Sequence, residues 1–355
     1  MRERIGVIGA GRMGLLIVRR LRGAGFEVTV ADAVEGRRDA ARDAGAAIGR
    51  SAQDVAAAVD VLITVLPGPT EVREVMLGVA TTDAVAITDA VATTDAAATA
   101  ASTSEPSAAA PADAETESRA GAISAMRPGT VWLDLSSNDP RVATEIAEAA
   151  AEHGVLSVGA PMGGGPTDAA AGTIRFHVGG APDAVARIEP ILEHLSRPGG
   201  IVRLGPDIAA GFTAKLLVNL LWFGQAVAVT EAMLLGQRLG IAPALFRDLL
   251  PGSAGESAFT TGSLDALLDG DDLATFGIDR VVEELDALVA LADAEGTPFE
   301  LSTLVTRLHR EALDRFGPID GELLAARLLE DRAGAVLRAP VGGGTATEIV
   351  EPLAG

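Results

Sequence analysis

A glycine pattern near the N-terminus is the feature that most restricts the fold of this chain. The run Gly9-Ala10-Gly11-Arg12-Met13-Gly14 follows a short apolar segment, Ile5–Ile8, and opens Met13–Leu21, whose apolar residues recur with helical period. In a strand–turn–helix of this kind, the first glycine permits a tight turn and the second lets the backbone approach a pyrophosphate. The third lets the helix pack closely on the strand. Because the helix N-terminus presents free N–H groups to the phosphate, the pattern predicts a dinucleotide-binding fold.

An acidic residue at the distance that such a fold requires supports this interpretation. Asp32 directly follows a second strand-like run, Val28–Ala31. A carboxylate there accepts hydrogen bonds from the ribose hydroxyls and repels a 2′-phosphate, so NAD is favoured over NADP. Arg37 and Arg38 lie close enough in the sequence to keep NADP open as the alternative.

Further strand signals alternate with helical ones and indicate a doubly wound parallel sheet. We expect these strands at Val61–Leu66, Thr130–Leu135, Val155–Ala160, Thr173–Val178 and Ile201–Leu204. Between about residues 80 and 118 the chain consists mainly of Ala, Thr, Asp, Ser and Pro in near-repeats. Such a segment cannot bury enough apolar surface to offset the entropy of ordering, which predicts a low-complexity surface insertion.

A long apolar helical pattern runs from Ala209 to Leu239, and the chain stays helical in pattern to about Leu329. A membrane span is the competing interpretation. Polar residues such as Lys215 and Glu231 interrupt the pattern and no basic flank anchors it, so the centre of an all-helical domain is favoured. The predicted domains are a Rossmann domain at 1–204, an all-α domain at 205–330 joined through the long helix, and a tail at 331–355.

Composition excludes several classes of function. The formal charge of −21 argues against nucleic acid and anionic membranes as partners, since both require basic patches. The chain has no cysteine, and its four histidines lack metal-ligand spacing, so we expect neither thiol chemistry nor a metal site. No apolar signal core follows Met1, which predicts a cytoplasmic protein.

Two rare residue types stand close together on the long helix. Among the 28 Lys and Arg residues Lys215 is the single lysine, and Asn138 and Asn219 are the only asparagines. Lys215 and Asn219 are four residues apart and therefore share a helix face. Apolar surroundings and a nearby helix N-terminus would disfavour the charge of Lys215, as a general acid/base near neutral pH requires. A lysine that merely reaches solvent beside an unrelated asparagine is the structural alternative.

Two loops are candidates for ligand binding. Gly159-Ala160-Pro161-Met162-Gly163-Gly164-Gly165-Pro166 follows a strand, and its backbone N–H groups suit a carboxylate. The run Asp134-Leu135-Ser136-Ser137-Asn138 also ends a strand, at the sheet edge where ligands bind in open α/β folds.

The order of these motifs resembles the β-hydroxyacid dehydrogenase family, which includes 3-hydroxyisobutyrate dehydrogenase and tartronate semialdehyde reductase. Five motifs carry the resemblance: the glycine pattern, Leu66-Pro67, Asp134 to Ser137, Ala160 to Gly165, and Lys215-x-x-x-Asn219. It is similar, less closely, to 6-phosphogluconate dehydrogenase.

The resemblance implies a Rossmann domain, a helical domain that pairs subunits in a homodimer or larger assembly, and an active site in the cleft between the domains. It implies proton transfer by Lys215 with Asn219 as its partner. Leu66, Pro67 and Ser137 would line the cofactor, while Met162, Gly163 and Gly164, together with Ser137, would hold the substrate.

Two positions depart from the family pattern. The substrate loop has Gly163-Gly164-Gly165 where the family usually has Ser-Gly-Gly, so a hydroxyl donor is lost while the backbone N–H groups remain. The later Lys-Asp-Leu motif, whose lysine reaches the cofactor, falls on Glu283-Glu284-Leu285.

The expected reaction is hydride transfer between NAD(P) and a small 3-hydroxy acid. The lost hydroxyl suggests a rival, an NADPH-dependent imine or ketone reductase on the same scaffold. A rival of another class is a non-catalytic dinucleotide-binding sensor, which would fit the acidic surface and the insertion.

Overall fold

The structure, a computed structural model, describes residues 3–79 and 119–338. The insertion predicted at 80–118 and the end of the predicted tail lie outside the described residues. The chain divides into two compact units, residues 1–213 and 214–355. This division comes later than the sequence-based boundary after residue 204, because Ile208 and Phe212 are buried in the core of the first unit. Residues expected in the tail belong to the second unit, where Leu337 is fully buried.

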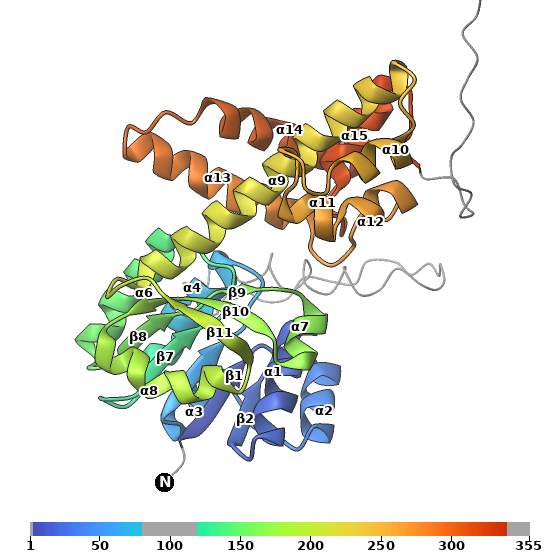
Figure 1. Cartoon of the computed structure of the whole chain (residues 1–355). Coiled ribbons are helices and arrows are strands. Elements are labelled where there is room, and N and C mark those ends of the chain that lie inside the picture. The colour runs from blue at the N-terminus through green and yellow to red at the C-terminus, as the bar shows by residue number, and fades with distance from the viewer. Residues whose placement is uncertain (1–2, 80–118, 339–355) are drawn as a thin grey trace, which may run out of the picture. The chain divides into compact units, whose positions relative to one another are not determined.

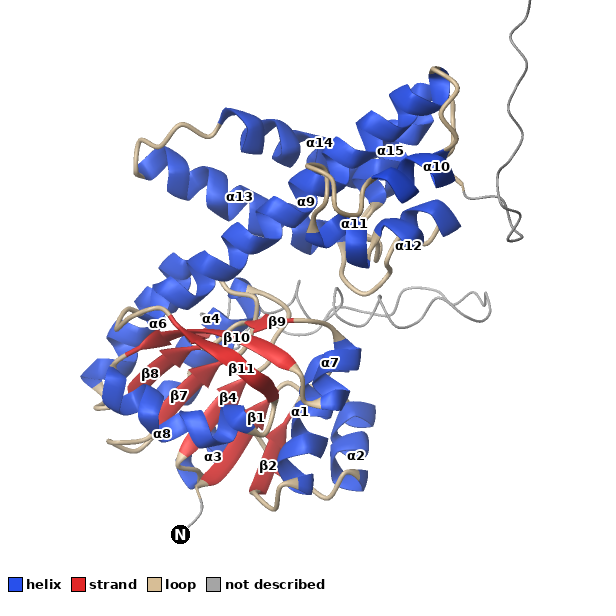
Figure 2. Ribbon diagram, in the orientation of Figure 1, coloured by secondary structure: helices blue, strands red, loops and turns tan. Residues whose placement is uncertain are grey.

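The first unit is built on one twisted sheet (Figure 2). Its strands are β1 (Arg4–Ile8), β2 (Glu27–Ala31), β3 (Ala47–Ile48), β4 (Val61–Thr64), β7 (Val131–Asp134), β8 (Leu156–Gly159), β9 (Met162–Gly163), β10 (Ile174–Gly180) and β11 (Ser196–Arg203). Their order is β11-β10-β8-β7-β4-β1-β2-β3, with β9 paired to β10. In register, Ile5 of β1 lies opposite Val28 on one side and Val61 on the other, both parallel. This confirms the Rossmann sheet, with its topological switch point between β1 and β4.

One end of the sheet differs from the parallel arrangement that the sequence predicts. β10 runs antiparallel to β8, with Gly179 opposite Gly159. After β8 the chain does not return across the sheet but turns at the carboxyl edge through β9, which pairs antiparallel with β10. β11 then lies parallel to β10. The candidate substrate loop is therefore a turn at the carboxyl edge.

Helices cover both faces of this sheet (Figure 1). One apolar layer contains side chains of α1 (Arg12–Gly23), α2 (Glu35–Asp43), α7 (Pro166–Ala171) and α8 (Pro182–Glu193). The other contains side chains of α3 (Ala52–Ala58), α4 (Pro69–Leu77), the 3₁₀ turn η1 (Ala122–Ala125), α6 (Pro140–Glu152) and the start of α9 (Ile208–Arg238). Because both faces are buried, the central strands are apolar throughout, as in β4 with Val61, Leu62 and Ile63.

The residues that flank the predicted insertion are paired with each other. β5 (Gly78–Val79) and β6 (Arg119–Ala120) form a separate two-stranded antiparallel sheet, with Gly78 opposite Ala120. The two ends of the insertion are therefore held together at one point of the first unit, and the Rossmann core does not depend on the residues between them.

The second unit is all helical in the part that the structure describes. It contains most of α9 together with α10 (Pro243–Leu249), α11 (Ala258–Gly262), α12 (Leu264–Asp269), α13 (Ile278–Ala294), α14 (Glu300–Phe316) and α15 (Leu324–Ala333). Leu216, Leu220 and Phe223 of α9 pack with side chains of α13, α14 and α15. By length and composition α9 could span a membrane, but 39% of its most apolar window is buried inside the protein. Packing against three other helices supports the interpretation of α9 as the central helix of this unit.

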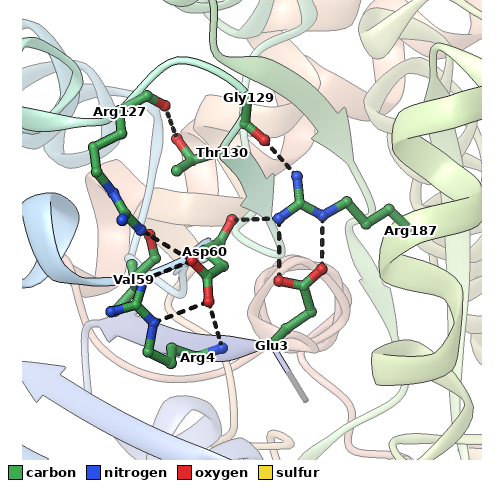
Figure 3. Close-up of polar contacts among 8 residues, drawn as sticks. All are labelled: Glu3, Arg4, Val59, Asp60, Arg127, Gly129, Thr130 and Arg187. Atoms are coloured by element: carbon green, nitrogen blue, oxygen red, sulfur yellow. Dashed lines mark hydrogen bonds and ion pairs between the residues drawn. The ribbon is translucent and has the colours of Figure 1, made fainter. Parts of the chain in front are cut away.

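A network of arginines and carboxylates joins the amino ends of three central strands (Figure 3). The Asp60 carboxylate, which precedes β4, accepts hydrogen bonds from Arg4 Nε at 3.0 Å, Arg4 Nη2 at 2.7 Å and Arg127 Nη2 at 2.9 Å. Arg187 of α8 pairs with Glu3 at 2.7 Å. These contacts lie at the opposite edge of the sheet from the glycine loop, so we assign them to stability. Hydrogen bonds from Arg4 hold the pKa of Asp60 well below its usual range.

We predict that Asp60→Asn lowers the free energy of unfolding by about 1–2 kcal/mol, since a charge-assisted hydrogen-bond pair is lost. Because folding lowers the pKa of Asp60, its stabilisation is complete above the ordinary value of 3.8 and is lost as the pH falls below it. The difference between wild type and variant should therefore shrink in acid. Urea unfolding at pH 7 and in acid measures both effects.

The matched control is Asp39→Asn, which removes the partner of Arg42 in a pair whose side chains are 59% and 56% exposed. It should change stability by only a few tenths of a kcal/mol. Equal effects of the two substitutions would contradict a special role for the Asp60 network.

Candidate functional site

The glycine loop after β1 has the geometry that a dinucleotide requires. Gly9 has φ +94°, and a Cβ there would lie 2.2 Å from the carbonyl oxygen of Val65. A Cβ on Gly14 would lie 2.0 Å from the carbonyl oxygen of Gly9, so only glycine lets α1 approach the turn. Gly11, by contrast, has no atom within 4 Å of its Cβ position and borders open space at the start of α1. Two glycines are thus needed for packing, and the third leaves room for a phosphate beside the free N–H groups of α1.

Asp32 lies at the end of β2, where the sequence analysis expects it. Its two carboxylate oxygens accept hydrogen bonds from the backbone N–H groups of Ala10 at 2.7 Å and Val34 at 2.8 Å. Each oxygen keeps a lone pair for a ribose hydroxyl. Arg38 donates to the carbonyl oxygens of Asp32 and Ala33, both at 2.8 Å, so its guanidinium is bound to the turn.

A buried polar network shapes the carboxyl ends of β4 and β7. Asp134 is fully buried and accepts hydrogen bonds from Thr64 Oγ1 at 2.8 Å, Ser136 N at 3.0 Å and Asn138 Nδ2 at 2.8 Å. Burial raises the pKa of Asp134, and the hydrogen bonds partly oppose this shift. Leu66 N in turn donates to Ser136 Oγ at 2.9 Å, which ties the two predicted cofactor-lining loops together.

Ser137 lies between two anchored residues. Its neighbours Ser136 and Asn138 are buried, whereas Ser137 itself is only half-buried. Leu66 precedes Pro67 and the start of α4 on the adjacent loop. The structure therefore brings Leu66, Pro67 and Ser137 to one edge of the sheet, as predicted, and gives Asn138 a structural role there.

The candidate substrate loop forms β9 and the turn that follows it. Met162 and Gly163 pair with β10, and Gly164 adopts φ +118°, which favours glycine. Gly165 N donates to Asp168 Oδ2 at 3.0 Å, which fixes the turn at the start of α7.

A histidine that the sequence analysis took to be surface or structural lies beside this loop. His177 of β10 is 8% exposed, and its Cε1 lies 3.4 Å from the Cβ position of Gly163. Where the family pattern has a serine hydroxyl, this chain therefore has a glycine with an imidazole next to it. Strand alternation alone could not have revealed this neighbour, because the register of β9 on β10 is set by the turn.

In the second unit, Lys215 and Asn219 converge on one carboxylate. They lie one turn apart on α9, and Glu284 of α13 faces both. Lys215 Nζ forms an ion pair with Glu284 Oε1, and Asn219 Nδ2 donates to Glu284 Oε2 at 2.7 Å. Lys215 and Glu284 are each 7% exposed. A charged pair so far from water persists only when its hydrogen bonds are made, as they are here.

Two features of this triad differ from the sequence-based picture. α9 begins at Ile208, so Lys215 lies well past the first turn, beyond the reach of the helix dipole. The Glu284 carboxylate, which the sequence analysis did not assign to Lys215, stabilises the ammonium form. The adjacent Glu283 is bound instead by Arg280 on the same helix, at 3.0 Å.

The predicted site residues thus fall into two groups, a glycine-rich sheet edge in the first unit and the Lys215 triad in the second. Within residues 3–79 and 119–338 no group of three His, Cys, Asp or Glu side chains is arranged to hold a metal ion.

Comparison with known proteins assigns both units. The NAD-binding domain of 6-phosphogluconate dehydrogenase matches residues 4–110 and 86–205. The NAD-binding domain of NADP-dependent 3-hydroxyisobutyrate dehydrogenase matches residues 209–329.

Individual relatives are similar over most of the chain. NAD-dependent L-serine dehydrogenase of Pseudomonas aeruginosa is 30% identical over 71% of this chain and 70% of that protein. The structure of Mycobacterium tuberculosis 3-hydroxyisobutyrate dehydrogenase with L-serine superposes with a TM-score of 0.72 at 25% identity, over 92% of this chain and 99% of that one. An imine reductase from Pseudomonas sp. shares the fold, with a TM-score of 0.52 at 18% identity over 92% and 99%.

The homologues are dehydrogenases that act on the hydroxyl groups of hydroxy acids, which leaves the non-catalytic sensor without support. Together with the glycine loop and the two-unit fold, these matches show that the chain belongs to the β-hydroxyacid dehydrogenase family of NAD(P)-dependent oxidoreductases.

Proposed function

We propose that this enzyme reversibly oxidises a small 3-hydroxy acid to its semialdehyde or keto acid, with Lys215 transferring the proton. The observation that carries the proposal is the single lysine of the chain, buried and bound to Glu284 beside Asn219. A general acid/base must be held at a fixed point and must be able to change its protonation state. Lysine meets both conditions here.

Each residue of the triad has a distinct role in this proposal. In the oxidative direction neutral Lys215 accepts the proton of the substrate hydroxyl, and in the reductive direction its ammonium donates a proton to the carbonyl oxygen. Asn219 orients the hydroxyl or the amine. Glu284 holds both side chains in place, because each of its oxygens accepts from one of them.

The cofactor would be held by the first unit and would supply the hydride acceptor or donor. Gly9, Ala10, Gly11, Arg12, Met13 and Gly14 would bind its pyrophosphate through backbone N–H groups, and Asp32 its ribose. Leu66, Pro67 and Ser137 would line the nicotinamide end. The carboxylate of Asp32 favours NAD, and NADP is the alternative.

The substrate carboxylate would be held by the backbone of Met162, Gly163 and Gly164, together with Ser137. A turn whose N–H groups point outward suits an anion. The L-serine and 3-hydroxyisobutyrate dehydrogenases among the relatives, named for small hydroxy acids, support this substrate class.

A cytoplasmic homodimer or larger assembly is the proposed form of the enzyme. The helical unit exposes large apolar side chains on α9, among them Val218, Leu221 and Leu235 at 54%, 64% and 62%. Burying such a surface against a second copy is favourable.

A second candidate is the reduction of an imine or bulkier ketone. The observation that favours it is the missing hydroxyl at Gly163, with His177 beside it. It predicts turnover of uncharged substrates and little response to 3-hydroxy acids.

We predict that wild-type protein reduces NAD with small 3-hydroxy acids and that Lys215→Ala lowers kcat by about 10²–10⁴-fold, the usual contribution of a general acid/base. Binding of NADH, followed by its fluorescence, should stay within about twofold of wild type. Near-normal turnover by the variant would refute the role of Lys215. Reduction of cyclic imines without hydroxy-acid turnover would support the second candidate.

Removing the charge partner of Lys215 should destabilise the protein. Glu284→Leu leaves an ammonium buried without its carboxylate and Asn219 without its acceptor, so we expect a loss of about 3 kcal/mol in the free energy of unfolding. The matched control is Glu283→Gln, one residue away, whose partner Arg280 is 29% exposed and where we expect less than about 1 kcal/mol. Urea unfolding compares them. Equal losses would show that the Lys215–Glu284 pair contributes nothing special.

Cofactor preference should depend on Asp32. Asp32→Asn keeps one acceptor oxygen for Ala10 or Val34 but removes the negative charge, so the ratio of kcat/KM for NAD over NADP should fall by about tenfold, equivalent to 1.4 kcal/mol. Steady-state kinetics with both cofactors measures this ratio. An unchanged ratio would mean that other groups select the cofactor.

A further inference from the structure

A carboxylate that the proposed chemistry does not use lies in the loop before α15. Glu322 is half-buried and accepts a hydrogen bond from Thr275 Oγ1 at 2.7 Å. Its loop is fastened to the segment 273–276, since Glu322 N donates to the carbonyl oxygen of Leu273 at 3.3 Å and Gly321 N to that of Phe276 at 2.9 Å.

The same segment contacts the proton-transfer lysine. Lys215 Nζ lies 5.8 Å from the ring centroid of Phe276, the neighbour of Thr275. Adjacent residues of one segment therefore contact Lys215 and bind the side chain of Glu322. This places Glu322 beside the Lys215–Glu284 pair from a third element of the helical unit.

The charges around Glu322 favour a carboxyl group that holds a proton more readily than usual. Burial is the main cause that raises the pKa of Glu322, and the nearby Glu284 carboxylate raises it further. The hydrogen bond from Thr275 and the charge of Lys215 act in the opposite direction. Asp272, in the adjoining chain, is paired with Arg327 of α15 at 2.7 Å.

The reaction needs a route for one proton in every turnover. Lys215 is 7% exposed, so it has little direct access to water. Glu284 is a poor carrier, because its two oxygens are bound to Lys215 and Asn219. Glu322 is the titratable group that is both coupled to Lys215 and partly open to solvent.

We propose that Glu322 carries the proton between Lys215 and solvent. In oxidation, the hydroxyl proton moves to the neutral amine of Lys215, the resulting ammonium passes a proton to the Glu322 carboxylate, and Glu322 releases it to water. Lys215 is then neutral again, and one proton has left per hydroxyl oxidised. Reduction runs the same steps backwards. This inference rests on the proposed function, and Glu322 acts through Lys215 rather than on the substrate.

The single lysine allows a test that needs no substrate. Protein labelled with ¹³Cε-lysine gives one side-chain resonance, from Lys215. In wild type this resonance should shift in a step as Glu322 gains its proton, above the usual range of a glutamate. Glu322→Gln, which keeps an acceptor for Thr275 but cannot ionise, should abolish that step. Asp320→Asn, two residues away, should preserve it. A step that survives in Glu322→Gln would overturn the coupling of the two groups.

Kinetics tests the proton route itself. Glu322→Gln should lower kcat by about tenfold or more while the KM of the substrate and the NADH affinity stay near wild type. Small buffer acids such as imidazole should restore the rate, and Glu322→Asp should keep most of it, neither of which a purely structural role predicts. An unchanged kcat, or a loss that no buffer acid rescues, would overturn the relay. Failure of the proposed function would show differently, as wild-type protein that turns over no hydroxy acid.

Discussion

The Glu284 carboxylate is the contact on which the chemistry of the helical unit depends. It is almost completely buried, and each of its oxygens binds one of the two rare polar residues of α9, Lys215 and Asn219. Removing a carboxylate and an ammonium from water is costly, so the pair is stable only while both are present and hydrogen-bonded. The packing of α13 on α9, with Leu285 and Leu288 in the shared apolar core, brings the two charges together. Position and charge of the lysine thus follow from helix packing.

The first unit separates stability and ligand binding between the two edges of its sheet. At the amino edge, guanidinium groups join β1, β4 and β7 through Asp60. At the carboxyl edge the backbone is exposed at Gly11, and the adjoining loops are held from below by Asp134. A parallel sheet allows this division because all its carboxyl ends meet at one edge, where the switch between β4 and β1 opens a crevice.

Much of this could be predicted from the sequence, because the relevant signals are local. The glycine loop, Asp32, the strands up to β8 and the length of α9 follow from spacing and period alone. Features that depend on how distant segments meet could not be predicted. Whether Glu283 or Glu284 faces Lys215 depends on the rotation of α13, and the neighbour of Gly163 depends on the register between β9 and β10. The expected helix-dipole effect on Lys215 was wrong for a simpler reason, since α9 begins earlier than its first polar residue suggests.

The amino-acid usage of the chain now has a chemical explanation at one position. Of the 28 Lys and Arg residues only one is lysine, so arginine meets nearly every need for a positive charge. An arginine at position 215 could form the same ion pair with Glu284, and with better geometry, because its planar group binds a carboxylate through two hydrogen bonds. It could not give up its proton, however, since the guanidinium stays charged in proteins. A lysine retained where arginine would bind more strongly indicates that the group must exchange a proton, and structural pairing alone would not require it.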